Sequence, residues 1–288
     1  MPPTSSSFTP LNIPSDAVPE WMGSFTISAP PNTDLWRKPP SRDTSTAPIL
    51  YTALRNPFIA AEVTVSANWE LEWDQGGLVI FAGMPPGQIP TTTTAPAIDA
   101  PSIVSLTLND TDSAFPPIQS LPDLSSTPYT HGHTPLPPLI TQARPRDPPP
   151  PYPQPAPAAK WVKVGLEFCN NACHATSVVA NSDGADWSLS ALPPHHARRL
   201  DLRVKIERIG YALWVWYEDE VLGWKKLREV TWFFWGVDDK AVRVGVYASR
   251  PANFGLSIYE RRHGGGAGGV VGEGGRNLSV EFEGLEIF

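Results

Sequence analysis

Hydrophobic and polar residues alternate with a period of two in several short segments of this chain, which is typical of strands with one buried face. In KWVKVGLEF (160–168), Val162, Val164, Leu166 and Phe168 fall on one side, and Trp161, Lys163, Gly165 and Glu167 on the other. Comparable segments are RLDLRVKIER (199–208), YALWVWYE (211–218), EVTWFFWGV (229–237), AVRVGVYAS (241–249) and NLSVEFEGLEIF (277–288). No stretch of about 12 residues has a helical period. We therefore predict an all-β fold, either an antiparallel sandwich or a barrel.

Proline divides the chain. Residues 85–157 hold 20 of the 34 prolines and none of the 11 tryptophans, so this segment lacks the side chains of a core. We predict a flexible tail over residues 1–20, one β-sandwich domain formed by residues 21–84 and 158–288, and a disordered Pro-rich insertion over residues 85–157. A second interruption, the Gly-rich segment 263–275, lacks the Lys-Ser/Thr ending of a phosphate loop and is expected to be a flexible hairpin tip.

Composition excludes several classes of protein. Hydrophobic residues make up 41% of the chain and charged residues 18%, which is enough apolar material for a core. The formal charge of −7 argues against a nucleic-acid binder, which normally has a basic surface. The sequence has no apolar run of about 18 residues and no secretory signal, so we expect a cytoplasmic protein that does not bind membranes.

The cysteines do not predict a metal site. Cys169 and Cys173 lie four residues apart with His174 beside them, and these three crowded side chains fall short of the four ligands of a structural zinc site. We expect reduced structural cysteines, no metal and no cofactor.

Four segments together resemble a known family: DQGGLVIF (74–81), KWVKVGLEF (160–168), SVVANSDGADWS (177–188) and VGVYASRP (244–251). In this order they are similar to the concanavalin A-like domain family of unknown function that includes the fungal regulator-of-enolase protein. The resemblance spans most of the chain outside the insertion and implies a two-sheet jelly roll. It also suggests a regulatory role in carbohydrate metabolism, although this fold hosts lectins, glucanases and scaffolds alike.

The polar face of the predicted sheet is the candidate ligand site. In jelly rolls of this kind the concave sheet commonly binds the ligand, and tryptophan beside charged and amide side chains suits a sugar. We expect binding by Gln75, Lys163, Glu167, Arg203 and Trp214, with Asp186 and Trp187 at the rim. Substitution of Lys163 or Glu167 by Ala is then expected to abolish binding with little change in melting temperature. The alternative is that these residues form a solvated or ion-paired sheet face, with the tryptophans in the core.

A carbohydrate-active enzyme is the rival hypothesis. A glycosidase needs two carboxyl groups near one another across a cleft. The candidates are Glu70, Glu72 and Glu167, because Glu70, Glu72 and Asp74 alternate in WELEWDQ and would share one strand face. Asp74 is also expected to cap backbone amides, beside a turn or bulge with positive φ at Gly76 and Gly77. A lyase using Lys163, Arg203 and Tyr247 is a further alternative.

The insertion suggests a third class, a protein-interaction scaffold. Pro149, Pro150 and Tyr152 belong to a Pro-Pro-x-Tyr sequence, the pattern that WW domains bind as a polyproline helix. A spacer that happens to contain tyrosine explains the same residues. The leading hypothesis is a binding module for a carbohydrate-like metabolite or a protein partner such as a metabolic enzyme.

Overall fold

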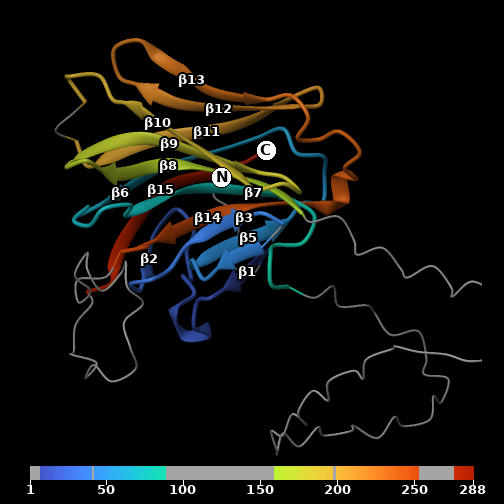
Figure 1. Cartoon of the computed structure of the whole chain (residues 1–288), viewed down its shortest axis with the longest axis horizontal. Helices are drawn as coiled ribbons and strands as arrows, with labels where there is room; N and C mark the ends of the chain where they lie inside the picture. The colour runs from blue at the N-terminus through green and yellow to red at the C-terminus, as the bar shows by residue number, and fades with distance from the viewer. Residues whose placement is uncertain (1–6, 41, 89–158, 197–198, 253–275) are drawn as a thin grey trace, which may run out of the picture. The chain divides into compact units, whose positions relative to one another are not determined.

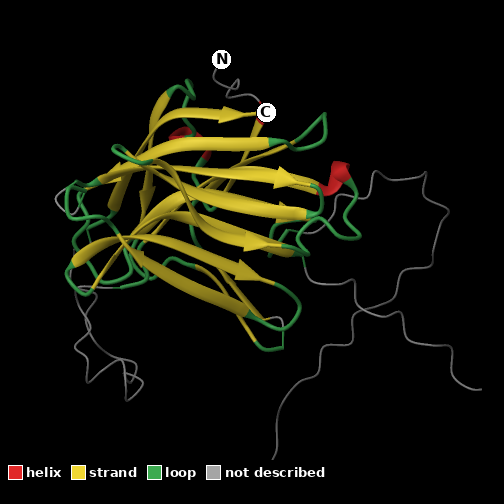
Figure 2. Cartoon of the chain, turned by 90° about the horizontal axis from the view of Figure 1, so that it is seen from above, coloured by secondary structure: helices red, strands yellow, loops and turns green. Residues whose placement is uncertain are grey.

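A computed structural model describes residues 7–40, 42–88, 159–196, 199–252 and 276–288 (Figure 1). Two antiparallel sheets face each other across a hydrophobic core, so the predicted all-β jelly-roll sandwich is confirmed (Figure 2). The helical segments within the described ranges are single turns, Ser15–Ala17 and Asp239–Ala241, which are too short to reach across a bilayer.

The first sheet has seven strands in the order β1-β5-β14-β7-β8-β9-β10. They are β1 (Phe8–Leu11), β5 (Ile49–Ala53), β14 (Val242–Ser249), β7 (Gln75–Ala82), β8 (Lys160–Cys169), β9 (Ala172–Ala180) and β10 (Ala185–Ala191). The strands β7 and β8 are direct neighbours, with Ala82 opposite Lys160, although a long stretch of sequence separates them. Most of that stretch, residues 89–158, lies outside the described residues.

The second sheet has six strands in the order β13-β12-β11-β6-β15-β2. They are β13 (Gly223–Val230), β12 (Ala212–Asp219), β11 (Asp201–Ile209), β6 (Ala60–Ala67), β15 (Leu278–Ile287) and β2 (Ser24–Ala29). Alternate residues are buried in β2, β6, β11 and β12, so each of these strands has one face in the core and one face outside, whereas the edge strand β13 buries only Val230.

The main core lies between the two sheets, where the alternation predicts it. Val162, Val164 and Leu166 of β8 pack into the same cluster as Val204 and Ile206 of β11. Each of these side chains is at most 1% exposed. The period-two pattern therefore identifies the inward faces of both strands.

A second apolar layer covers the other face of the seven-stranded sheet. The hairpin of β3 (Leu35–Lys38) and β4 (Arg42–Ser45) places Leu35 against Val79, Trp161 and Tyr247, all of which point away from the main core. The buried Arg37 side chain fixes this hairpin, because its guanidinium binds the Asp43 carboxylate and donates to the carbonyl oxygens of Ala159 and Asn181. The alternation predicts a solvated or ligand-bearing face here and does not reveal this layer.

Two predicted boundaries are corrected. Phe8–Leu11 forms β1 and pairs with β5, so the folded domain begins before residue 21 and the tail prediction is wrong for these residues. The segment EVTWFFWGV is a strand only up to Val230, and turns follow over residues 231–236. There Phe233 and Phe234 enter the core from a turn, which explains the apolar run without a strand.

Candidate functional site

A cavity of about 250 Å³ lies on the outer face of the seven-stranded sheet, beside the β3–β4 hairpin. Its lining combines three tryptophans with four polar or charged side chains. The lining residues are Asp34, Trp36, Trp73, Gln75, Lys163, Glu167, Val178, Trp187 and Pro251. Gln75, Lys163, Glu167 and Trp187 are among the predicted ligand-binding residues, and the structure brings these four together.

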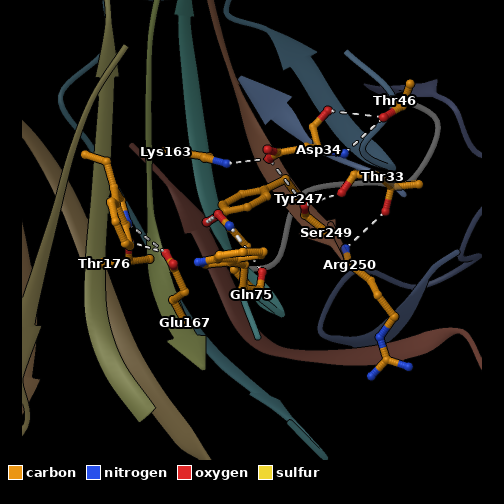
Figure 3. A network of polar contacts seen from close by, with 12 residues as sticks. Thr33, Asp34, Thr46, Gln75, Lys163, Glu167, Thr176, Tyr247, Ser249 and Arg250 are labelled. Atoms are coloured by element: carbon orange, nitrogen blue, oxygen red, sulfur yellow. Dashed lines mark hydrogen bonds and ion pairs between the residues drawn. The ribbon is translucent and has the colours of Figure 1, made fainter. Parts of the chain in front are cut away.

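Lys163 reaches the cavity from the middle of β8. Its Nζ atom donates to Oδ1 of Asp34 at 3.0 Å and lies 5.4 Å from the centre of the Tyr247 ring (Figure 3). Asp34 precedes β3, and Thr46 fixes its backbone through the bond from the Asp34 amide to the Thr46 hydroxyl. Lys163 is 1% exposed, so its charge is neutralised within the protein rather than by water.

Glu167 lies four residues further along β8, on the same face. It is 1% exposed, and its Oε2 atom accepts hydrogen bonds from the Thr176 hydroxyl at 2.7 Å and from Nε1 of Trp187 at 3.1 Å. Burial raises the pKa of Glu167, and the Thr176 bond, the Lys163 charge and the Trp187 bond act in the opposite direction. No described residue donates a hydrogen bond to Oε1, so this oxygen is left for a ligand donor.

Gln75 begins β7 directly opposite Glu167 in the strand ladder. Its Oε1 atom accepts from the Tyr247 hydroxyl at 3.3 Å, and its Nε2 atom donates to the carbonyl oxygen of Trp73. Burial raises the pKa of Tyr247 well above its ordinary range, and the negative charges of Glu167 and Asp34 add to this effect. Tyr247 therefore remains a neutral hydrogen-bond donor, and a lyase mechanism with Tyr247 as base finds no support.

Three tryptophans from separate parts of the chain wall the cavity: Trp36 of β3, Trp73 before β7 and Trp187 of β10. Trp73, in the loop before β7, and Trp187, in β10, are 40% and 42% exposed, although tryptophan is highly buried on average. Trp73 also has a φ of 68°, a left-handed conformation that a bulky residue rarely adopts. Backbone bonds hold it there, because the Trp73 amide donates to the carbonyl oxygen of Phe168.

A buried ion pair supports the loop that presents Trp73. Asp74 and Arg250 are joined by two bonds, from Nε to Oδ1 at 2.8 Å and from Nη2 to Oδ2 at 2.6 Å. The same Asp74 carboxylate accepts from the backbone amides of Glu70 and Leu71, so the predicted capping role of Asp74 is confirmed. Gly76 and Gly77 do not make a turn, because both belong to β7, where Gly77 has a φ of 159°.

Arg203 and Trp214 do not join this site. Both belong to the six-stranded sheet and point away from the core, on the opposite face of the sandwich from Lys163. Arg203 binds Glu62 at 2.6 Å, and the Lys226 ammonium lies 3.2 Å from the centre of the Trp214 ring. Asp186 is also separate from Trp187, because successive residues of β10 face opposite sides and Asp186 binds Arg228 instead.

Glu70 and Glu72 do not lie in the cavity, and they do not share a strand face. Residues 68–74 form a loop with a turn, which corrects the strand expected for WELEWDQ. Glu72 accepts hydrogen bonds from the Asn170 amide and the Cys169 thiol, and Glu70 lies 3.7 Å from the Arg250 guanidinium. The carboxyl pair predicted for a glycosidase from Glu70, Glu72 and Glu167 is therefore not assembled across this cavity.

The two cysteines are reduced structural residues at the end of the β8–β9 hairpin. Burial raises the pKa of Cys169 to about 11, with a contribution from the Glu72 hydrogen bond, and burial alone raises that of Cys173 to about 11. Both thiols are therefore un-ionised at neutral pH. In the described part of the chain, no group of three or more His, Cys, Asp or Glu side chains is arranged to hold a metal.

A larger cleft of about 800 Å³ lies beside the edge strands β10 and β13. Its two arginines are already paired within the protein, Arg37 with Asp43 and Arg228 with Asp186. We assign the site to the smaller cavity because only there do buried polar groups retain hydrogen-bonding capacity beneath aromatic walls.

Some predicted features lie outside the described residues. These are Pro149, Pro150 and Tyr152 of the Pro-Pro-x-Tyr sequence and the Gly-rich segment 263–275. Conversely, Asp34, Trp36 and Trp73 are site residues that the sequence pattern does not predict. Trp73 directly precedes the Asp-Gln sequence from which Gln75 is predicted as a site residue, so its position in the sequence indicates the site. Asp34 and Trp36 reach the site only because the β3–β4 hairpin packs against the sheet.

Comparison with known proteins identifies the family. Residues 11–86 and 154–263 match the DUF1349 family, described as a protein family of unknown function, and the chain belongs to this family. The uncharacterized protein AN7484 of Emericella nidulans is 30% identical over 234 residues, which cover 80% of this chain and 79% of the relative.

A solved structure of a functionally unknown protein shares the fold. A functionally unknown protein from Saccharomyces cerevisiae superimposes with a TM-score of 0.54 at 15% identity and covers 99% of this chain and 98% of its own. LamA from Z. galactanivorans, solved in complex with laminaritriose and laminaritetraose, gives a TM-score of 0.40 at 10% identity, with 99% of this chain and 93% of that chain covered.

Proposed function

We propose that this protein is a sugar-binding module whose ligand occupies the cavity between Trp36, Trp73 and Trp187. The cavity volume of about 250 Å³ lies near the lower end of small-molecule sites, which suits a monosaccharide or one terminal unit of a longer glycan. Aromatic rings stack on the C–H faces of a sugar ring, while carboxylate, ammonium and amide groups bind its hydroxyls.

The observation that carries this proposal is the Glu167 carboxylate. A buried carboxylate costs free energy unless it is fully hydrogen-bonded, yet Glu167 receives both of its bonds on Oε2. A ligand hydroxyl donating to Oε1 satisfies the remaining oxygen. Lys163 is a neighbouring donor and Gln75 retains a second amide proton, so donors and acceptors for adjacent hydroxyls stand side by side.

The family resemblance extends the proposal to physiology. We place the module in the cytoplasm, where it senses a sugar and regulates carbohydrate metabolism. Recruitment of a partner through Pro149, Pro150 and Tyr152 is compatible with this role and remains a separate prediction.

A thermal-shift titration of the full chain with glucose, galactose, mannose and xylose tests the proposal. A ligand that binds only the folded state raises the melting temperature, so at least one of these sugars is expected to do so. Trp187→Ala removes a wall of the cavity and the Nε1 donor and should abolish the rise. Trp214→Ala is the matched control on the opposite face and should retain it. No shift with any of the four sugars, or equal shifts in both variants, contradicts the proposal.

A further inference from the structure

We propose that the cavity selects its sugar by charge: it takes a sugar with a protonated amine in preference to a neutral sugar, and it excludes sugar phosphates and uronates. The inference rests on the proposed function and adds the chemical class of the ligand. It follows from which charges in the cavity are already neutralised and which one is not.

The charges that line the cavity are those of Asp34, Lys163 and Glu167. Lys163 is paired with Asp34 at 3.0 Å, so its positive charge is already balanced. Arg250 lies beside the lining residue Pro251, but its guanidinium binds the Asp74 carboxylate beneath the site. Among the described residues that line the cavity, one negative charge is therefore left over, and it resides on Glu167.

A protonated amine matches this arrangement in two ways. It donates to Oε1 of Glu167, and a charge-assisted hydrogen bond of this kind is roughly twice as strong as a bond between neutral groups. It also sits between tryptophan rings, whose faces attract cations electrostatically. Burial raises the pKa of Glu167, which shows that the internal donors do not fully compensate for its loss of hydration.

A phosphate or carboxylate on the sugar meets the opposite situation. It approaches Glu167, a like charge that is 1% exposed and poorly screened by water. To gain a counter-ion it must displace Asp34 from Lys163, which leaves Asp34 without its ammonium partner. Breaking a buried pair in this way is costly, so anionic sugars are disfavoured.

Isothermal titration calorimetry with four probes tests this selectivity on the full, unmodified chain. The probes are glucosamine, glucose, N-acetylglucosamine and glucose 6-phosphate, at a pH where glucosamine is protonated. Glucosamine is expected to bind at least about tenfold more tightly than glucose, the equivalent of about 1.4 kcal/mol. N-acetylglucosamine, whose nitrogen is an uncharged amide, should show no such gain, and glucose 6-phosphate should bind at least about tenfold more weakly than glucose.

Two variants test whether the Glu167 charge causes the selectivity. Glu167→Gln keeps the size of the side chain and removes its charge, so glucosamine should lose its advantage over glucose. Glu62→Gln is the matched control, because Glu62 pairs with Arg203 on the opposite face and its loss should leave the ranking unchanged.

The outcomes separate the two proposals. Equal affinities for glucose and glucosamine, or tighter binding of glucose 6-phosphate than of glucose, overturn charge selectivity and leave sugar binding intact. Binding of none of the four probes overturns the charge selectivity, and the proposed function falls with it where the thermal-shift titration is also flat. The ranking of sugar affinities on the unmodified chain tests the charge selectivity even where a variant fails to fold.

Discussion

At the scale of single residues, burial and hydrogen bonding act in opposite directions on the Glu167 carboxyl group. Burial favours the neutral acid, whereas the Thr176 hydroxyl, the Lys163 ammonium and the Trp187 indole favour the carboxylate. Burial prevails, and the pKa is raised from its ordinary value of 4.5. The folded protein therefore binds this proton more tightly than the unfolded chain does.

A pH dependence of stability follows from this shift. The stabilising contribution of a group with a raised pKa in the folded state is fully present below the unfolded pKa and is lost as pH rises through the folded pKa. Glu167→Gln cannot ionise, so it escapes this loss. We expect the melting temperature of the variant, relative to the unmodified protein, to increase as pH rises from below 4.5 toward neutrality. Differential scanning calorimetry of both proteins across this range measures the difference.

Glu72→Gln is the control for this experiment, because the Glu72 side chain lies outside the cavity and accepts a hydrogen bond from the Asn170 amide. The difference between Glu72→Gln and the unmodified protein should not reproduce the rise seen with Glu167→Gln. If the difference in melting temperature between Glu167→Gln and the unmodified protein stays constant across the pH range, the folded state does not bind this proton more tightly than the unfolded chain.

The same residues show what alternation reveals about a single side chain. The period of two in KWVKVGLEF places Lys163 and Glu167 correctly on the face opposite Val162 and Val164. It does not reveal their burial, because the cover comes from the β3–β4 hairpin and from β10, which are distant in sequence. Substitution of Lys163 by Ala is therefore expected to lower the melting temperature as well as binding, which corrects the expectation of a neutral surface change.

At the scale of elements, the pairing of β7 with β8 depends on glycines. Gly77 lies directly opposite Gly165, and a Cβ atom on Gly165 would collide with the carbonyl oxygen of Gly76. A Cβ atom on Gly77 would likewise collide with the carbonyl oxygen of Val164. This close approach belongs to the same ladder that sets Gln75 beside Glu167, so the glycines serve the site as well as the sheet.

Gly165→Ala should therefore destabilise the protein strongly. The added methyl group meets backbone rather than a movable side chain, and overpacking of this kind costs about 3 kcal/mol. The free energy of unfolding in urea, measured by circular dichroism, gives the value.

Gly184→Ala supplies the comparison, since the nearest heavy atom to its Cβ would be Pro39 Cδ at 3.5 Å, an ordinary contact. Its effect should stay within about 0.5 kcal/mol. Similar effects of the two substitutions would contradict the importance of the close approach.

Elements also show where local patterns mislead. Glu70, Glu72 and Asp74 alternate as they would in a strand, but Asp74 caps the amides of Glu70 and Leu71 and closes a turn. The aromatic run after Val230 is likewise a turn, whose buried phenylalanines fill the core without strand pairing. In both segments, hydrogen bonds and core packing that do not follow the period of a strand determine the local structure.

At the scale of the whole sandwich, the decisive question is which sheet each polar face belongs to. Alternation shows that Arg203 and Trp214 point away from the core, and it shows the same for Lys163 and Glu167. It contains no information on which of two sheets a strand joins, because both sheets follow the same period. The sequence therefore predicts the sandwich and half of the site, and it merges two faces that the topology keeps apart.

Separation of the two faces gives a prediction for paired substitutions. Trp187→Phe keeps an aromatic wall but removes the Nε1 donor to Glu167, so sugar affinity should fall by about tenfold, the cost of one hydrogen bond to a charged group. Trp214→Phe changes the same atoms on the opposite face, where the ring contacts Lys226, and sugar affinity should not change. Because the two sites share no partner, the double variant should show the sum of the two single effects within about 0.5 kcal/mol. Calorimetric titration of the three variants measures these values, and a loss of affinity in Trp214→Phe would mean that the ligand is bound on the six-stranded sheet instead.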